Sequence, residues 1–173
     1  MNKLTLLFLA VALFFGIPAN KVQAQASVTA QAFAEVIAAL TAMETSQLNF
    51  GRFSPEEQGG QIHLSPQGQL YASGTLALSG GVHNPASFYI TGQTDATFSI
   101  TLPSGPAVLT NVSNSKTMTV SNWISDPPSG IGAGVLEGGA LAVNVGATLT
   151  VGNMSDNPVG IYAGTYSITF AYN

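Results

Sequence analysis

Apolar and polar residues alternate along much of this chain with a period of two, which is typical of β-strands that bury one face. The alternation is strict over residues 98–102, 118–120 and 141–145. A fourth alternating run, residues 166–172, places Tyr166, Ile168, Phe170 and Tyr172 on one face, so these side chains are predicted to lie in the core or at its rim. Shorter strands are predicted at residues 48–53, 61–64, 70–78, 87–91, 107–112 and 148–151.

Turn-forming residues separate these runs. Examples are Gly59-Gly60, Gly80-Gly81 and Asp126-Pro127-Pro128. Many short strands with short connections predict an all-β protein built as an antiparallel two-sheet sandwich. The glycine-rich residues 130–139 are expected to form a long surface loop.

One stretch, residues 30–43, fits two interpretations. Phe33, Val36, Ile37 and Leu40 have helical spacing, and the stretch is rich in alanine, which favours a helix. From further upstream the same region alternates with period two, which predicts an edge or donor strand with one small apolar face. That face consists of Val28, Ala30, Ala32, Ala34 and Val36.

The first 24 residues have the pattern of a signal peptide. Lys3 precedes an apolar run over residues 4–16, and Val22-Gln23-Ala24 fits a signal-peptidase site. The run is shorter than the roughly 20 apolar residues that span a bilayer, and no later run approaches that length, so no transmembrane segment is predicted. We therefore expect export to the periplasm, the outer surface or the medium, with residues 25–173 as a single domain.

Charge is sparse, at 7% of residues, and the chain has no cysteine. Residues 25–173 contain two basic side chains, Arg52 and Lys116, against eight acidic ones. Nucleic acids and anionic lipids are bound by clustered Lys and Arg, so neither is expected as a partner. Disulfides are excluded, and packing with hydrogen bonding must stabilise the domain.

The sequence offers little for catalysis, and no cofactor is expected. His63 and His83 are the only histidines, no Gly-x-Ser-x-Gly motif accompanies them, and two distant histidines without cysteine cannot form a structural zinc site. Glu56 and Glu57 are adjacent, which is poor geometry for two cooperating carboxylates. We predict neither a catalytic residue nor a metal site.

Two further motifs are better explained structurally, and one aromatic residue is a candidate for ligand binding. Asn153, Asp156 and Asn157 contain calcium-type oxygen ligands but lack EF-hand spacing, so a turn is expected. Residues 130–134 are glycine-rich but lack the Lys-Ser/Thr of a phosphate-binding loop. Trp123 is the aromatic residue that we single out as a ligand contact.

The ordered set of motifs resembles a family of secreted bacterial domains, of the domain of unknown function 4402 type, which borders the spore-coat-protein-U-like proteins and the archaic chaperone–usher pilins. The matching motifs are Leu48-Asn49-Phe50-Gly51, residues 88–92, residues 98–103 and residues 160–172. The resemblance implies an immunoglobulin-like antiparallel β-sandwich whose first strand is the alanine-rich segment. Pilin-type relatives commonly carry a disulfide near the N-terminus, which this chain lacks.

Together these observations predict an exported, non-catalytic surface structural subunit, fimbrial or adhesin-like, with protein partners or self-assembly. The alternative is a monomeric carbohydrate- or surface-binding module. If the segment from Val28 to Val36 fills the groove of its own domain the protein is a monomer, whereas filling a neighbour's groove produces a filament. The direct run into Leu48 without a flexible linker favours filling its own groove.

Overall fold

The computed structural model describes residues 25–173, and the predicted signal peptide lies outside them. The described residues form an all-β structure with antiparallel pairing throughout, as predicted. The chain divides into two units between Glu35 and Val36, and all the strands lie in the second unit. The strands are β1 (Thr41–Ser46), β2 (Arg52–Leu64), β3 (Leu70–Gly80), β4 (Ala86–Thr91), β5 (Thr97–Thr101), β6 (Ala107–Asn111), β7 (Thr117–Asp126), β8 (Gly130–Val135), β9 (Ala140–Val151), β10 (Tyr162–Ala163) and β11 (Thr169–Tyr172), with a short 3-10 turn at Glu137–Gly139 before β9.

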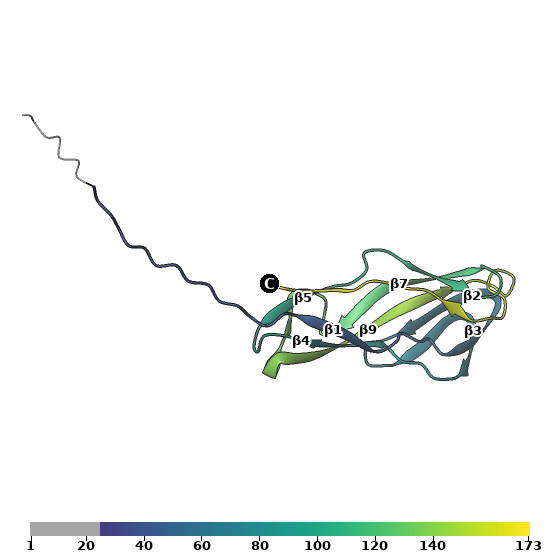
Figure 1. The fold of residues 1–173 in the computed structure, drawn as a ribbon. Helices are drawn as coiled ribbons and strands as arrows, with labels where there is room; N and C mark the ends of the chain where they lie inside the picture. Colours follow the sequence, from purple (N-terminus) through teal and green to yellow (C-terminus); the bar gives the residue numbers. More distant parts are fainter. Residues whose placement is uncertain (1–24) are drawn as a thin grey trace, which may run out of the picture. The chain divides into compact units, whose positions relative to one another are not determined.

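The larger sheet is organised around β9, the long strand at its centre (Figure 1). One edge of β9 pairs first with β4, from Ala140 opposite Thr91, and then with β2, up to Val151 opposite Gly60. The other edge pairs with β7, and β6 and β10 follow. β1 pairs with β4 on the side away from β9.

The smaller sheet has the order β11-β5-β8 and packs on the larger one. Phe98 and Ile100 of β5 are fully buried against Ile90 of β4 and against Val143 and Val145 of β9. Phe170 of β11 packs between the sheets, with its ring centroid 6.1 Å from that of Phe98 and 5.7 Å from that of Phe88. The two sheets thus bury one shared core in a β-sandwich-like arrangement.

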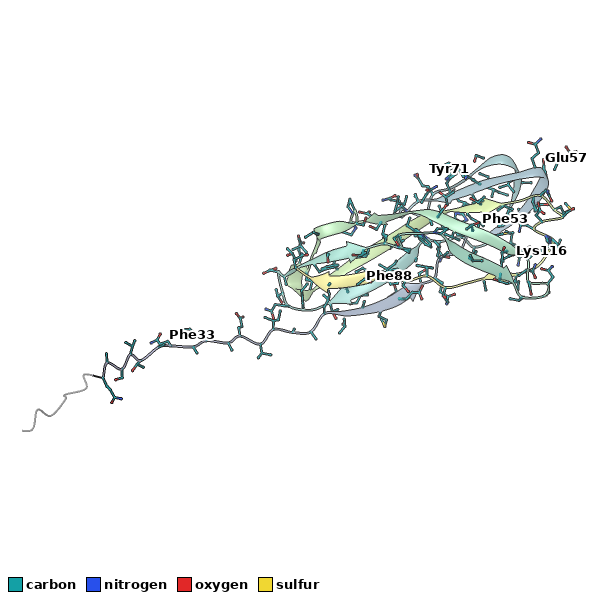
Figure 2. All side chains as sticks on the ribbon, turned by 90° about the horizontal axis from the view of Figure 1, so that it is seen from above. Phe33, Phe53, Glu57, Tyr71, Phe88 and Lys116 are labelled. Atoms are coloured by element: carbon teal, nitrogen blue, oxygen red, sulfur yellow. The ribbon has the colours of Figure 1, made fainter. Side chains whose placement is uncertain are left out.

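A second core cluster lies at the opposite end of the larger sheet, where the β2–β3 hairpin bends. The register of the hairpin shifts between Pro55 and Gly59, and only residues 60–64 of β2 continue the pairing onto β9. Phe53 precedes the bend in β2, and Leu76 of β3 lies opposite Pro55 on the same half of the hairpin. Both pack on this cluster, which includes Ile62, Leu64, Val120 and Leu149. Figure 2 shows Glu57 at this end of the sheets and Phe88 among the strands nearer the other end. The hairpin therefore folds over its own core.

Two sequence expectations fail here for identifiable reasons. Residues 130–135 are not a loop but strand β8, which pairs with β5, and a side chain at Gly134 would collide with the ring of Phe98. Of the alternating run of residues 166–172, only Thr169–Tyr172 form a strand, β11. The chain leaves β6 after β10 and reaches β5 only at β11, so the residues in between have no strand partner. The prediction that Tyr166, Ile168, Phe170 and Tyr172 pack at the core is confirmed.

The stretch of ambiguous periodicity, residues 30–43, contributes three residues to β1, and residues 25–40 contain neither helix nor strand. The end of this stretch is tied to the domain by Tyr172. Its hydroxyl donates a hydrogen bond to the Ala38 carbonyl at 2.9 Å and accepts one from the Gln93 amide at 2.7 Å. Ala38 is thereby held at the end of the sheets where β1 starts.

The bend in β2 generates the first prediction. Gly59 has a φ of +72°, and a Cβ at this position would collide with the Val151 carbonyl of the neighbouring strand. Gly59→Ala should lower the free energy of unfolding by about 2 kcal/mol or more, measured by chemical denaturation. Gly105→Ala is the control, because nothing lies within 4 Å of the added methyl group. Equal stability of the two variants would show that the bend does not depend on Gly59.

Candidate functional site

Three strands, β1, β10 and β11, each leave one edge open. β1 pairs with β4, β10 with β6 and β11 with β5, and on its other edge none of them has a ladder partner among residues 25–173. Between β10 and β11, residues 164–168 belong to no strand. Unpaired edges present backbone N–H and C=O groups that can pair with another strand.

A groove of two connected cavities runs between these edges. The larger, of about 830 Å³, lies between residues 44–50 and residues 161–168. The smaller, of about 500 Å³, lies between residues 48–55 and residues 157–162, toward the β2–β3 bend. Both cavities are lined by Leu48, Asn49, Phe50, Leu109, Ile161 and Tyr162, which makes them one continuous groove.

The floor of the groove is apolar and aromatic. Leu109 and Val120 reach it from β6 and β7, and Trp123 of β7 packs against Tyr166 at a centroid distance of 4.7 Å. The indole N–H of Trp123 donates to the Gly105 carbonyl at 3.2 Å. Trp123 is therefore a partly buried part of the groove, in contact with both core clusters.

Tyr166 brings an unsatisfied polar group into the groove. Its hydroxyl oxygen is buried and has no hydrogen-bond partner among the described residues. Burial, together with the carboxylate of Glu44, raises the pKa of Tyr166 to about 12 from its ordinary value of 10.0. A buried hydroxyl without a partner is costly. An occupant of the groove with a carbonyl group at this point would remove that cost.

The two ends of the groove carry opposite charges. Glu44 of β1 lines the larger cavity, and Arg52 at the start of β2 lines the smaller one. The Arg52 side chain is exposed and lies along Gly81. The groove therefore has an electrostatic direction, negative at the β1 end and positive toward the β2–β3 bend.

Buried asparagines hold the wall formed by residues 157–162. The Asn157 side chain accepts a hydrogen bond from the Gly152 amide at 2.5 Å and donates to the Thr117 carbonyl at 2.8 Å. Asn111 has a side-chain amide 3.5 Å from the Pro158 carbonyl. The hydroxyl of Tyr162 donates to the same carbonyl at 2.9 Å. These bonds position residues 157–161, which belong to no strand.

The predicted donor-strand residues are exposed. Val28 and Val36 are 90% and 97% exposed, and Ala30, Ala32 and Ala34 are exposed as well. The sequence analysis expected a groove, but of the residues that line it only Trp123 was singled out as a ligand contact. Leu48-Asn49-Phe50 and the aromatic Tyr162 and Tyr166 were visible signals, but nothing in the sequence placed them opposite one another.

The other candidates are separated in the structure. His63 stacks on Tyr71 at 4.6 Å and lies 3.0 Å from the Thr148 hydroxyl, whereas His83 is in the connection from β3 to β4. Glu56 and Glu57 lie at the β2 bend beside Asn153. The Asn153 side chain caps its own turn by accepting from the Ser155 and Asp156 amides.

Residues 25–173 contain no group of three or more histidine, cysteine or acidic side chains that could hold a metal ion. The same residues include no helix with the length and apolar character needed to cross a bilayer.

The fold and groove define an all-β domain with an open sheet edge. Comparison with known protein families shows which family it belongs to. A family model described as "Domain of unknown function (DUF4402)" matches residues 40–172. The chain belongs to this family, as the ordered motifs in the sequence indicated. Among curated proteins and among solved structures, none matches the chain.

The raised pKa of Tyr166 predicts that the stability of the domain depends on pH. Its hydroxyl stays protonated in the folded state up to about pH 12, whereas in the unfolded chain it ionises near 10.0. The folded state therefore binds more protons above pH 10, so its stability should decline as the pH rises from 10 toward 12. Tyr166→Phe should make this decline shallower in urea unfolding measured from pH 8 to 12. Parallel curves for the two proteins would contradict the assignment.

The two hydrogen bonds of the Asn157 side chain predict that removing it destabilises the domain. Asn157→Ala leaves the Gly152 amide and the Thr117 carbonyl without their partner, so unfolding free energy should fall by about 2 kcal/mol. Asn114→Ala removes one exposed hydrogen bond to the Lys116 amide and should cost under about 1 kcal/mol. Both values follow from chemical denaturation. A smaller loss for Asn157→Ala than for Asn114→Ala would refute this role.

Proposed function

We propose that this protein is an exported, non-catalytic structural subunit of the bacterial surface, whose groove is completed by an extended segment of a protein chain. Its domain would be an immunoglobulin-like sandwich with room for one more strand between β1 and the chain from residue 157 to 168. The observation that carries the proposal is the coincidence of the unpaired edges of β1 and β10 with a continuous groove whose floor carries apolar and aromatic side chains. Strand addition satisfies such edges by main-chain hydrogen bonds and takes specificity from alternate side chains.

The chemistry of the groove supports an extended peptide as the occupant. A strand inserted there would bring a row of carbonyl groups past the unpaired Tyr166 hydroxyl. Its inward side chains would contact Phe50, Leu109 and Trp123. Every second residue of a strand points to the same face, so an occupant with alternating apolar side chains fits this floor.

Trp123, the candidate ligand contact, has a place in this proposal. One of its neighbours is already Tyr166, and its N–H is already bonded to a backbone carbonyl. Its contact would therefore be with an inserted strand. As the only tryptophan in the chain, it would report occupancy through its fluorescence.

The function is tested by a matched pair of substitutions, each of which introduces one negative charge. Ile161 is 71% exposed and lines both cavities, so Ile161→Asp should abolish assembly while leaving the fold intact. Val108 is an exposed apolar residue of β6 that lines neither cavity, and Val108→Asp should assemble like the unchanged protein. Sedimentation measures assembly, and the melting temperature checks folding.

Two outcomes would contradict the proposed function. The first is a protein that is monomeric at all concentrations, whose Trp123 fluorescence does not respond to dilution. The second is an assembly that Ile161→Asp and Val108→Asp affect equally.

A further inference from the structure

The outer face of the larger sheet, opposite the groove, carries two rows of polar side chains. Ile62 of β2 and Leu149 of β9 are buried on the inner face, so the residues on either side of them along each strand point outward. The strand registers align these residues with outward-facing ones of β3 and β7. The rows are Ser73, Gln61, Thr150 and Thr119, and Tyr71, His63, Thr148 and Ser121. None of the eight is acidic, and none is lysine or arginine.

Tyr71 is the largest side chain of the two rows. It is 60% exposed although it lies in a strand, and Figure 2 shows it at the outer margin of the strands. Its ring stacks on the ring of His63, with the centroids 4.6 Å apart and the planes at 20°. This spacing matches that of neighbouring strands, so the two rings stand on β2 and β3 with their faces turned toward one another. One face of the Tyr71 ring is therefore covered, and the other is turned away from His63.

The uncovered face of the Tyr71 ring is turned toward an open strand edge. Among the described strands β3 pairs with β2 alone, so no strand lies beside it on the side away from His63. The face of an aromatic ring carries partial negative charge and attracts the C–H groups of a ligand. The open edge of β3 leaves this face accessible to such a ligand.

Polar groups without partners lie beside the ring. The Nδ1 atom of His63 is 3.0 Å from the Thr148 hydroxyl, which leaves Nε2 without a partner among residues 25–173. The side-chain amide of Gln61 likewise has no hydrogen-bond partner in the described part of the chain. Ser73, opposite Gln61 on β3, is exposed. Hydrogen-bond donors and acceptors thus stand next to one apolar ring face.

We propose that this face binds a neutral glycan, with a sugar ring stacked on Tyr71 and the sugar hydroxyl groups bonded to Gln61, Ser73 and Nε2 of His63. A sugar ring combines an apolar C–H face with a rim of hydroxyl groups, and this surface offers a contact for each. The absence of lysine and arginine from the two rows favours an uncharged chain. An anionic glycan would lose hydration there without gaining an ion pair.

The composition of the face favours a glycan over a protein or a nucleic acid. Protein interfaces have a core of clustered apolar and aromatic side chains, whereas in these two rows one exposed ring is surrounded by hydroxyl and amide groups. Nucleic acids require basic residues against their phosphates. Because Leu149 lines the groove from the inner face and Thr148 and Thr150 point outward, glycan binding does not compete with insertion of a strand.

Affinity electrophoresis of the exported protein tests the proposal. Native gels would contain dextran, hydroxyethyl cellulose or galactomannan, which are neutral, or alginate, which is anionic. We expect retardation in at least one neutral gel and none in alginate. Tyr71→Ala should weaken the binding by about five-fold, because the stacked ring is lost. Tyr71→Phe keeps the ring and should bind within about two-fold of the unchanged protein.

Tyr89→Ala is the matched control. Tyr89 is 46% exposed on the same outer face, and its partner Ala142 is six residues from Thr148 along β9, about 20 Å away. Its removal should leave the binding unchanged. Gln61→Ala keeps the Tyr71 ring and should weaken binding by about three-fold through the lost hydrogen bond. The melting temperature checks folding, and Gln61→Ala tests the site even if Tyr71→Ala does not fold.

Four results would overturn the proposal. The first is no retardation of the unchanged protein in any of the three neutral gels, and the second is equal retardation in alginate. The third is an equal effect of Tyr71→Ala and Tyr89→Ala, and the fourth is an equal loss with Tyr71→Phe and Tyr71→Ala.

The groove variant separates this proposal from the proposed function. Ile161→Asp, which should abolish assembly, lies outside the two rows and should still be retarded in the neutral gel. Loss of retardation in Ile161→Asp with its fold intact would contradict a binding site on the single domain.

Discussion

The groove exists because the chain changes sheets between residues 162 and 169. β10 pairs with β6 in the larger sheet, and β11 pairs with β5 in the smaller one. The residues between them belong to no strand, and they face the open edge of β1 across an apolar floor. The two cavities, the unpaired hydroxyl of Tyr166 and the place of the partly buried Trp123 in the groove all follow from this change of partner.

The two core clusters explain how the domain tolerates such an opening. The cluster around Phe98 joins both sheets and needs no further strand, since Phe170 of β11 already covers it. The cluster around Leu149 is covered on one side by the folded β2–β3 hairpin, through Phe53 and Leu76. The groove lies where the hairpin's cover ends. Stability can thus come from the closed Phe98 cluster and the covered side of the Leu149 cluster, while the open side of the Leu149 cluster is available for a partner.

Periodicity predicted most of the strands because one buried face leaves a local signal. Residues 98–102 and 87–91 correspond closely to β5 and β4, and residues 141–145 and 148–151 are two parts of β9. The sequence could not predict β8, in which Gly134 leaves room for the Phe98 ring and the alternate glycines hide the apolar alternation of a strand. Nor could it predict that one alternating run, residues 166–172, begins outside any strand, because strand pairing depends on distant partners.

The candidate site was less predictable than the fold for the same reason. Trp123 was identified as an isolated aromatic residue, but its neighbour Tyr166 is 43 positions away in the sequence. The charges of Glu44 and Arg52 acquire meaning only when β1 and β2 place them at opposite ends of one groove. The alternating face of residues 28–36 was visible from the start, but these residues are exposed and belong to no strand.

Hydrogen exchange at the open edges measures the central claim most directly. Backbone amides on the open edge of β1 and in residues 164–168 should exchange slowly in the assembled protein and rapidly in the Ile161→Asp variant, because an inserted strand would pair with them. Amides of β9, which are paired on both edges, should be protected in both proteins. Equal, rapid exchange at the open edges of the two proteins would show that no strand completes the groove.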